Sequence, residues 1–529
     1  MKPRVHSGGV TWSTLLLTAL SLSIGWGIRG NFGHEFGAMI PGALAALAVV
    51  LLSGREDWWP RVASFAFFGA LGWSFGGSMS YMQVIGYTHS GHSLSVFYGF
   101  ACLFVIGFLW AAMGGAGTAL PAFLSREQLA ALPGPLSAVF LAWLAQDLLE
   151  THWLERDPAF RHEDPLYWFD TDWVAAWLAM CVGLARVLVR RRFDPASSLI
   201  LHMATGWMLA FLILVNALGW RMTPPRGDNW AGCVGMTIGL WIWLQRNGLP
   251  GVTLASLVAG FIGGFGFAGG QLLKLFGIAT GWNTNWHSAL EQTYGFINGA
   301  GIAVAVGLLI SRAPRLENGP STDRWRWTQV YAVAFVLLGI TFLNLRRNPS
   351  DWVKAKAFPE LMYGWSVSTW FHLGYLLLSV AVIGLLARHL RHPLALVPTT
   401  WLGRGQLLYL VFLWWVVIGN FERAVVSFAP ARLITEGVIF ANAALATVLL
   451  LWRAGPVVAG PVAGASPLPF PLRGATVLGV LGALASILLC WGVTRTAFGD
   501  RQLPGASKHI RFGPNATVFP KPKPGQTHP

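Results

Sequence analysis

The sequence predicts an all-α integral membrane protein, a polytopic bundle of about 14 to 15 transmembrane helices. Hydrophobic residues make up 54% of the 529-residue chain and charged residues 11%, whereas soluble domains carry about 25% charged residues. Apolar runs of about 17 to 25 residues, the length that crosses about 30 Å of hydrocarbon as a helix, recur along the whole chain. This composition excludes a series of soluble domains.

The apolar runs divide the chain into fifteen predicted spans. They cover residues 11–28, 37–53, 61–86, 94–118, 136–153, 173–190, 198–219, 231–246, 251–277, 289–310, 327–344, 366–388, 405–420, 433–452 and 474–494. The span 136–153 contains Gln146, Asp147 and Glu150, so whether it crosses fully stays open.

The distribution of basic residues between the spans predicts the orientation. With the N-terminus inside, the inner segments hold more Lys and Arg than the outer loops, and the basic cluster Arg186–Arg192 lies inside. The acidic loop Glu155–Asp172 then lies outside, while the basic loop Arg346–Lys356 is an exception. We therefore expect a cell (inner) membrane protein with a cytoplasmic N-terminus and an external C-terminal tail. The net charge of +15 is spread over these short clusters, so no nucleic-acid partner is predicted.

An ordered series of self-matches predicts a tandem duplication. The matching pairs are Gly25-Trp26 with Gly219-Trp220, Arg29-Gly30 with Arg226-Gly227, Gly76-Gly77 with Gly269-Gly270, and His92-Ser93 with His287-Ser288. Each unit holds six helices, an even number, so both enter the membrane from the same side and form parallel repeats.

The predicted organisation has four segments. The first six-helix repeat covers residues 1–195 and the second covers 196–396. About three C-terminal helices follow over 397–494, and the match beginning at Trp401 leaves open a third, half-length repeat. Residues 495–529 form a polar, basic tail that we expect to be disordered.

Polar side chains are costly inside a membrane, so their positions are informative. On the predicted topology they lie mainly at the outer ends of the spans, which indicates a polar cavity open to the outside. The segment Gly25–Gly42 is the densest example, because Arg29, Asn31, His34 and Glu35 occur there among several glycines. Glycine lets the backbone approach a ligand, and these side chains supply donors, acceptors and a base.

We assign candidate roles from this pattern. The predicted catalytic or ion-coupling residues are Glu35, His34, Lys274 and Glu291, and the predicted substrate-binding residues are Arg29, Asn31, His92, His287 and Arg226. The alternative for Arg29 and Glu35 is a structural ion pair, or an arginine that reaches the interface. His287 and Glu291, four residues apart on a predicted helix, supply two metal ligands at most, and no metal site is predicted.

The nine residues Arg29–Gly37 resemble the Arg-x-Gly-Asn-Phe…Glu…Gly signature of prolipoprotein diacylglyceryl transferases, although the spacing differs. That family works at the outer face of the inner membrane. The resemblance implies an enzyme that acts on a lipid-linked substrate there. The predicted helix count is about double that of the family.

Three functions are compatible with the sequence. The first is a secondary transporter or permease for a small polar or anionic solute, which the duplication and the glycine-rich spans favour. The second is a membrane-embedded transferase acting on a lipid-linked substrate, whose head group the aromatic outer loops would contact. The third is a structural subunit of a membrane complex. The sequence identifies no cofactor and no oligomeric state, and the lipid bilayer is the one partner it implies.

The orientation is testable with topology reporters. We expect a phosphatase–fluorescent protein reporter fused in the loop Arg312–Arg326 to read cytoplasmic, because that loop is strongly basic. The same reporter in the loop Glu155–Asp172 should read external. The opposite readings at both sites would reverse the topology and turn the polar cavity towards the cytoplasm.

Overall fold

The computed structural model describes residues 10–33, 35–76, 79, 81–149, 173–220, 222, 228–316, 322–394, 397–426, 430–453 and 469–507. The chain forms two compact units, each assembled from separate segments. The first unit contains Met1–Gly77, Gly107–Ala131 and Asn247–Cys490, and the second contains Ser78–Ile106, Leu132–Arg246 and Trp491–Pro529. These compact units are not the predicted repeats, and the duplication stays a prediction.

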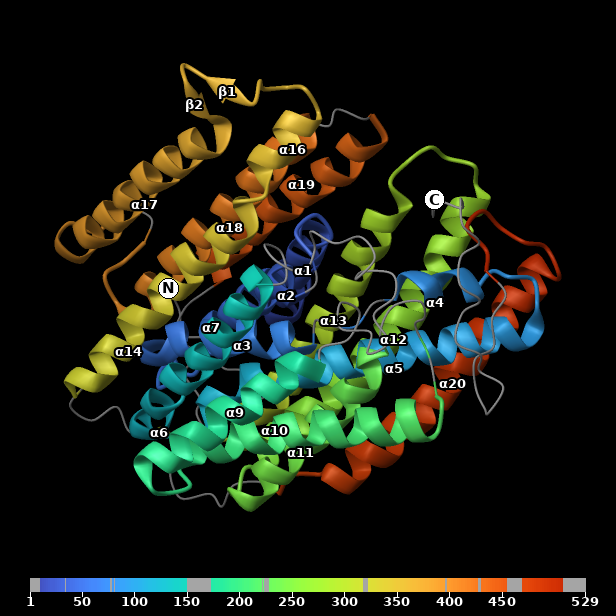
Figure 1. The fold of residues 1–529 in the computed structure, drawn as a ribbon, viewed down its shortest axis with the longest axis horizontal. Coiled ribbons are helices and arrows are strands. Elements are labelled where there is room, and N and C mark those ends of the chain that lie inside the picture. Colours follow the sequence, from blue (N-terminus) through green and yellow to red (C-terminus); the bar gives the residue numbers. More distant parts are fainter. Residues whose placement is uncertain are drawn as a thin grey trace. The chain divides into compact units, whose positions relative to one another are not determined.

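The described residues are almost entirely helical (Figure 1). The elements of the first unit are α1 (Trp12–Arg29), α2 (Glu35–Leu51), η1 (Trp59–Arg61), α3 (Val62–Phe75), η3 (Leu120–Ala122), α6 (Arg126–Ala131), α12 (Pro250–Ala279), α13 (Trp286–Ile310), α14 (Asp323–Ala334), η6 (Phe335–Ile340), α15 (Thr341–Leu345), α16 (Asn348–Lys354), β1 (Leu361–Met362), β2 (Trp365–Ser366), α17 (Val367–Arg391), α18 (Trp401–Val426) and α19 (Pro430–Arg453). The second unit has α4 (Met82–Tyr87), α7 (Pro133–Leu149), α9 (Trp173–Arg190), α10 (Pro195–Ala210), η5 (Phe211–Ala217) and α11 (Asn229–Arg246). Two long helices, α5 (Ser93–Ala119) and α20 (Leu472–Phe498), contribute to both units.

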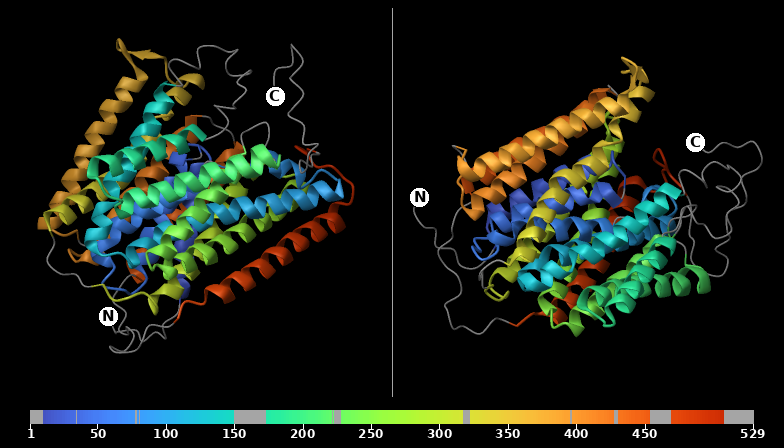
Figure 2. Two further views of the ribbon diagram at one scale, coloured as in Figure 1. Left: turned by 60° about the horizontal axis from the view of Figure 1, so that its bottom comes forward. Right: turned by 60° about the vertical axis from the view of Figure 1, so that its left-hand side comes forward.

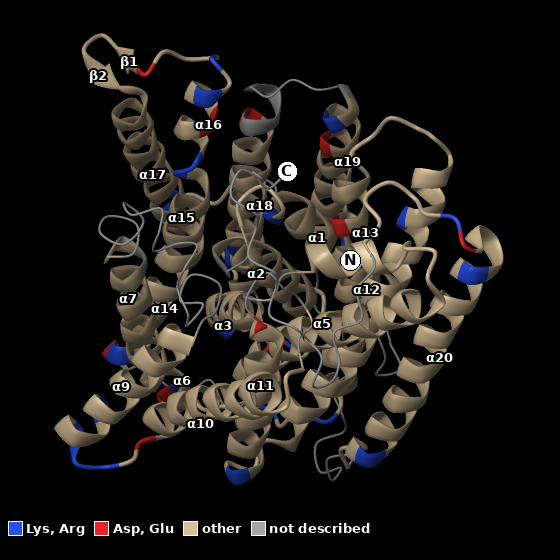
Figure 3. Cartoon of the chain, turned by 45° about the vertical axis from the view of Figure 1, so that its right-hand side comes forward, with Lys and Arg blue, Asp and Glu red and all other residues tan. Residues whose placement is uncertain are grey.

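Eleven helical segments within the described residues are long and apolar enough to cross a membrane. They are Ser93–Ala122, Arg126–Gln146, Trp173–Arg190, Pro195–Ala217, Pro250–Ala279, Trp286–Ile310, Asp323–Lys354, Val367–Arg391, Trp401–Glu422, Ala431–Arg453 and Leu472–Phe498. Figure 3 shows that the charged residues gather at helix ends and in connections. The chain is thus an all-α, multi-pass membrane protein, as its composition predicted.

The remaining predicted spans are also helical but are shorter or less apolar. They correspond to α1, α2, α11 and the pair α3 and α4. The span predicted at 61–86 is not one helix, because α3 ends before Gly76 and α4 begins only at Met82. Nearly every residue of α1 and α3 is buried by protein, so these helices do not need the uniform apolarity of a lipid-facing span.

Helix α1 is the centre of the first unit, packed between α2, α13 and α19. Glycines make these contacts close. A Cβ on Gly25 would overlap the backbone of Pro41 in α2, and a Cβ on Gly295 or Gly299 of α13 would overlap the backbone of α1 near Ser23 or Thr18. The spacing of Gly295 and Gly299 is that of the small-residue motif by which membrane helices pack backbone to backbone.

A cluster of polar contacts, here called the polar clamp, joins the C-terminal ends of α2 and α13. Arg55, after α2, pairs with Asp57 at 2.6 Å. It also donates hydrogen bonds to the carbonyls of Ile310, the last residue of α13, and of Ala313 and Pro314 beyond it. Burial alone would raise the pKa of Asp57, but the hydrogen bond and charge of Arg55 and the amide of Leu316 outweigh it and hold that pKa below its ordinary value. The clamp fixes the α2 and α13 ends, opposite the site described below.

Helices α16 and α17 and the hairpin β1–β2, whose strands have two residues each, form an outer layer of the first unit (Figure 2). Helix α18, which faces α17 across a groove, is itself mostly buried. Helix α17 begins at Ser366, whose hydroxyl accepts the amide of Thr369. Only four of its residues are buried: Val367, Ser379, Val382 and His389. A helix this apolar and this exposed is suited to contact with lipid.

The second unit is built around the α10–α11 pair. Gly206 and Gly235 face each other so closely that a Cβ on either would overlap the carbonyl of the other. Asp194 caps α10 by accepting the amides of Ala196 and Ser197. After α20, the amide of Ser507 donates to Gly86 O at 3.0 Å, so the chain to Ser507 packs on α4. The tail from 508 onward lies outside the described residues.

The α1–α13 contact can be tested with one methyl group. We expect Gly299→Ala to destabilise the protein by about 1–3 kcal/mol, because the new Cβ overlaps the Thr18 carbonyl and the helices must separate. Gly384→Ala in α17 is the matched control, since nothing lies within 4 Å of a Cβ there. Thermal stability of the detergent-solubilised protein, followed by fluorescence-detected size exclusion, distinguishes the two. Equal melting temperatures would contradict the close packing.

Candidate functional site

The site begins at Arg29, the last residue of α1. Its Nη1 lies 2.8 Å from Oε1 of Glu291 in α13, and the side chains of Arg29 and Glu291 are 3% and 2% exposed. The guanidinium lies 5.0 Å from the ring centroids of both Trp26 and Trp110. Such cation–π contacts favour a buried cation, particularly away from water. This is a fully buried ion pair enclosed by aromatic rings.

The pair exists because α1 and α13 approach closely at a glycine. A Cβ on Gly30 would overlap Oε2 of Glu291, so any other residue there would displace the carboxylate. One turn earlier, a Cβ on Gly27 would contact Gln292 and Ile439. Gly27 and Gly30 therefore make room for side chains from neighbouring helices.

Two further basic groups face Glu291. His287, one turn before it in α13, places Nε2 3.5 Å from Glu291 Oε1, and its side chain is 35% exposed. Lys274 of α12 lies near enough for its charge to interact with that of Glu291. Among the described side chains, the cluster therefore holds three basic groups, Arg29, Lys274 and His287, and the carboxylate of Glu291.

A second polar network lies beside the first and involves α18 and α19. Asn31 Nδ2 donates to Asn420 Oδ1 at 2.6 Å, and Asn420 Nδ2 donates to Glu436 Oε2 at 2.5 Å. Arg432 Nη2 donates to Asn31 Oδ1 at 3.2 Å. This network ties the turn after α1 to α18 and α19 and keeps Glu436 hydrogen-bonded, as a buried carboxylate requires.

The turn between α1 and α2 is also held from the α15–α16 segment. Arg347 Nη1 donates to Phe32 O at 2.7 Å, and Asn344 Nδ2 donates to Phe36 O at 3.1 Å. Gly33 has a φ of 101°, a conformation that favours glycine. The turn that carries Asn31 is thus fixed from two sides.

A crevice of about 320 Å³ opens between α1, α13 and α19. Its polar lining residues include Ser23, Gln292, Thr435 and Asn442, and Phe296 and Val438 contribute apolar surface. Gln292, next to Glu291 in the chain, donates to Thr435 O at 3.1 Å, and Ser23 donates to Gln292 O at 2.8 Å. Arg29 and Glu291 do not line the crevice, which is reached on α13 through Gln292, the residue after Glu291.

The structure brings several of the predicted residues together. Arg29, Asn31, Lys274, His287 and Glu291 all lie in the first unit, around the outward-predicted ends of α1 and α13. His92 belongs to the second unit, where its Nδ1 lies 3.0 Å from Ser95 Oγ. His34 and Arg226 lie outside the described residues, and Glu35 is described only as the first residue of α2.

Other residues of the site were not among the predicted site residues. Asn420 and Glu436 have a sequence signal, because they are polar residues near the ends of apolar spans. Gln292 carries the same signal, whereas Arg432 and Ser23 had none that distinguishes them from ordinary helix-end polar residues. Within the described part of the chain, no three His, Cys, Asp or Glu side chains are arranged to hold a metal ion.

The chain matches no protein family model, no curated protein and no solved structure. The resemblance to prolipoprotein diacylglyceryl transferases stays limited to residues 29–37. What the site can do must therefore be argued from its own geometry.

The ion pair can be tested by paired substitution. We expect Arg29→Met or Glu291→Leu alone to cost about 3–5 kcal/mol, because each leaves a buried charge without its counter-charge. The double variant should recover most of the loss, since no isolated charge remains. The melting temperatures of the parent, the two single variants and the double variant, measured in one detergent, give the coupling energy between the two side chains. Additive losses in the double variant would show that the two side chains do not depend on each other.

Proposed function

We propose that this protein is a secondary transporter that carries a small anionic solute together with protons. The observation that supports the proposal is the cluster of Arg29, Lys274 and His287 around the buried carboxylate of Glu291. Such a cluster can bind either a proton and an anion or neither, which is the requirement for coupled transport.

The coupling follows from charge balance. With Glu291 ionised, its carboxylate occupies one edge of the Arg29 guanidinium at 2.8 Å. Protonation of Glu291 removes its negative charge from beside Arg29 and Lys274, and the change in charge favours binding of an anion there. Arginine presents a planar set of donors suited to a carboxylate or phosphate. A bound anion in turn repels the ionised form of Glu291 and favours its protonated form, so proton and anion binding reinforce each other.

His287 supplies a route for the proton. It is 35% exposed, whereas Glu291 is 2% exposed, and their nearest side-chain atoms are 3.5 Å apart. A histidine ring can accept a proton on one nitrogen while the other nitrogen donates one. His287 therefore connects the solvent-accessible side of the site with the buried carboxylate.

A transporter also needs polar groups deeper in the bundle. Asn298, two turns beyond Glu291 along α13 and about 10 Å deeper, is completely buried against α12 near Gly263 and Gly266. Neither atom of its side-chain amide has a hydrogen-bond partner among the described residues. An unpaired buried amide costs about 1–3 kcal/mol, so its presence is best explained by a passing solute, ion or water.

A transferase acting on a lipid-linked substrate is the second candidate. The observation that favours it is the rim of the crevice, where Phe296 is 38% and Val438 46% exposed. An apolar rim around a polar floor would admit a lipid head group from the side. That function needs no passage to the inner face and no role for Asn298.

The transport hypothesis is tested in proteoliposomes that contain a pH-sensitive dye. Inward gradients of succinate, glutamate, phosphate and sulfate are imposed in turn, and entry of protons is recorded. We expect at least one anion to drive protein-dependent acidification of the lumen. Glu291→Gln should abolish it, by at least about tenfold, because Gln keeps the shape but cannot carry the proton.

Measurements of anion exchange distinguish a variant that has lost proton coupling from one that is misfolded. Glu291→Gln should retain counterflow of the labelled anion, since Arg29 and Lys274 remain, whereas a misfolded protein would lose both activities. Glu360→Gln, which removes an exposed carboxylate outside the site, is the matched control and should behave as the parent. No acidification with any of the anions, or full acidification by Glu291→Gln, would overturn the proposal.

A further inference from the structure

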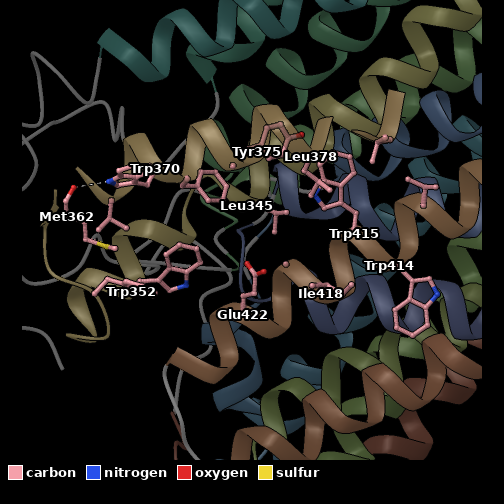
Figure 4. A pocket seen from close by; sticks show the side chains of 17 residues that line it. Leu345, Trp352, Met362, Trp370, Tyr375, Leu378, Trp414, Trp415, Ile418 and Glu422 are labelled. Atoms are coloured by element: carbon pink, nitrogen blue, oxygen red, sulfur yellow. Dashed lines mark hydrogen bonds between the residues drawn. The ribbon is translucent and has the colours of Figure 1, made fainter. Parts of the chain in front are cut away.

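A second cavity lies in the outer layer of the first unit, between α17, α18 and the α15–α16 segment. It has a volume of about 590 Å³ and is lined largely by aromatic and aliphatic side chains (Figure 4). Trp352, Trp370, Trp414 and Trp415 are among them. Lipid tails could occupy such a groove, but they would leave one of its features unexplained.

That feature is Glu422, the one charged side chain among the described residues that line the groove. Figure 4 shows its carboxylate directed into the groove between Trp352 and Ile418. Within the described part of the chain, Glu422 has neither a hydrogen-bond nor an ion-pair partner. Glu422 is exposed and is the last residue of its apolar segment, so its carboxylate can pair with a positive charge that a ligand brings into the groove.

The walls of the groove are held in place. Trp370 Nε1 donates to Met362 O at 2.9 Å, which fixes the hairpin at one end. The Tyr375 hydroxyl lies 2.6 Å from Thr341 Oγ1 and donates to Leu338 O at 2.7 Å, so its polar atom is engaged and its ring faces the cavity. The groove therefore combines fixed ring surfaces with one anionic group, the combination by which proteins recognise organic cations.

We propose that this groove binds a lipophilic cation, an apolar molecule with a quaternary or protonated nitrogen, or a phosphonium, beside Glu422. Its apolar body lies against Ile418, Trp415 and Trp414 along α18. From Glu422 to Val411, the far end of the lining on that helix, the groove is about 16 Å long. This site is separate from the proposed anion site, because Glu422 and Asn420 are two residues apart and face opposite sides of α18.

The test uses tetraphenylphosphonium as probe and tetraphenylborate, of the same shape and opposite charge, as its control. Equilibrium binding is measured to the full-length protein in nanodiscs of zwitterionic lipid, with empty nanodiscs subtracted. We expect saturable binding of tetraphenylphosphonium and none of tetraphenylborate. Glu422→Gln should weaken binding of the cation at least about tenfold, and Glu360→Gln should leave it unchanged.

A steric variant makes the test independent of charge. Gly374 lines the groove, and no atom lies within 4 Å of the position that a Cβ would take there. Gly374→Leu therefore places a side chain in the cavity without a backbone clash. Gly384→Leu, on the same helix but outside the groove, is the matched control. Gly374→Leu should abolish binding and Gly384→Leu should preserve it, with both melting temperatures near that of the parent.

Three results would overturn the proposal. Equal binding of both probes would make the groove a lipid-tail site without charge selection. Undiminished binding by Glu422→Gln or Gly374→Leu would place the cation elsewhere, and absence of saturable binding would remove the site. None of these results bears on proton-coupled anion transport, because Glu291 and Arg29 do not line this groove.

Discussion

The buried pair of Arg29 and Glu291 is the interaction on which the first unit depends. Two charges that are almost completely withdrawn from solvent are tolerable only with close geometry and additional partners. The rings of Trp26 and Trp110 and the glycines at 27 and 30 provide those conditions. The approach of α13 to α1 through Gly295 and Gly299 then sets the register that brings Glu291 to Arg29. Helix packing and the polar site are therefore a single arrangement.

The same helices are fixed at both ends by polar contacts of different kinds. At one end Arg55 and Asp57 join the chain after α2 to the chain after α13, mainly through backbone carbonyls. At the other end the contacts run between side chains, from Asn31 through Asn420 to Glu436. Carbonyl contacts are independent of side-chain protonation, whereas a carboxylate network changes when a proton binds.

Hydropathy predicted the fold class because lipid-facing helices such as α17 and α20 must be apolar along their length. It could not distinguish a helix surrounded by lipid from one surrounded by protein, which is why α1 and α3 were predicted as ordinary spans. The break between α3 and α4 was missed because Gly76 and its neighbours are also compatible with a continuous, closely packed helix. A turn that lies within an apolar run has too few distinctive residues for the break between two helices to be recognised from the sequence.

The site was predictable residue by residue but not as a set of contacts. Arg29 and Glu291 each stood out as ionisable groups near the end of an apolar span, yet they are separated by 262 residues. Nothing local in either segment encodes their pairing, which arises from glycine contacts between α1 and α13. Arg432 was missed for the same reason, since its hydrogen bond to Asn31 depends on where α19 lies.

Helix α18 relates the proposed anion and cation sites. Asn420 on one side joins the network that reaches Asn31, and Glu422 on the other side faces the aromatic groove. Between them, Gly419 O accepts a hydrogen bond from Asn348 at 2.9 Å, and a Cβ on Gly419 would contact Leu345. The segment with Asn348 and Leu345 also carries Arg347, which holds Phe32 O. The groove and the α1–α2 turn therefore contact the same short segment, Asn344–Asn348, on its two sides.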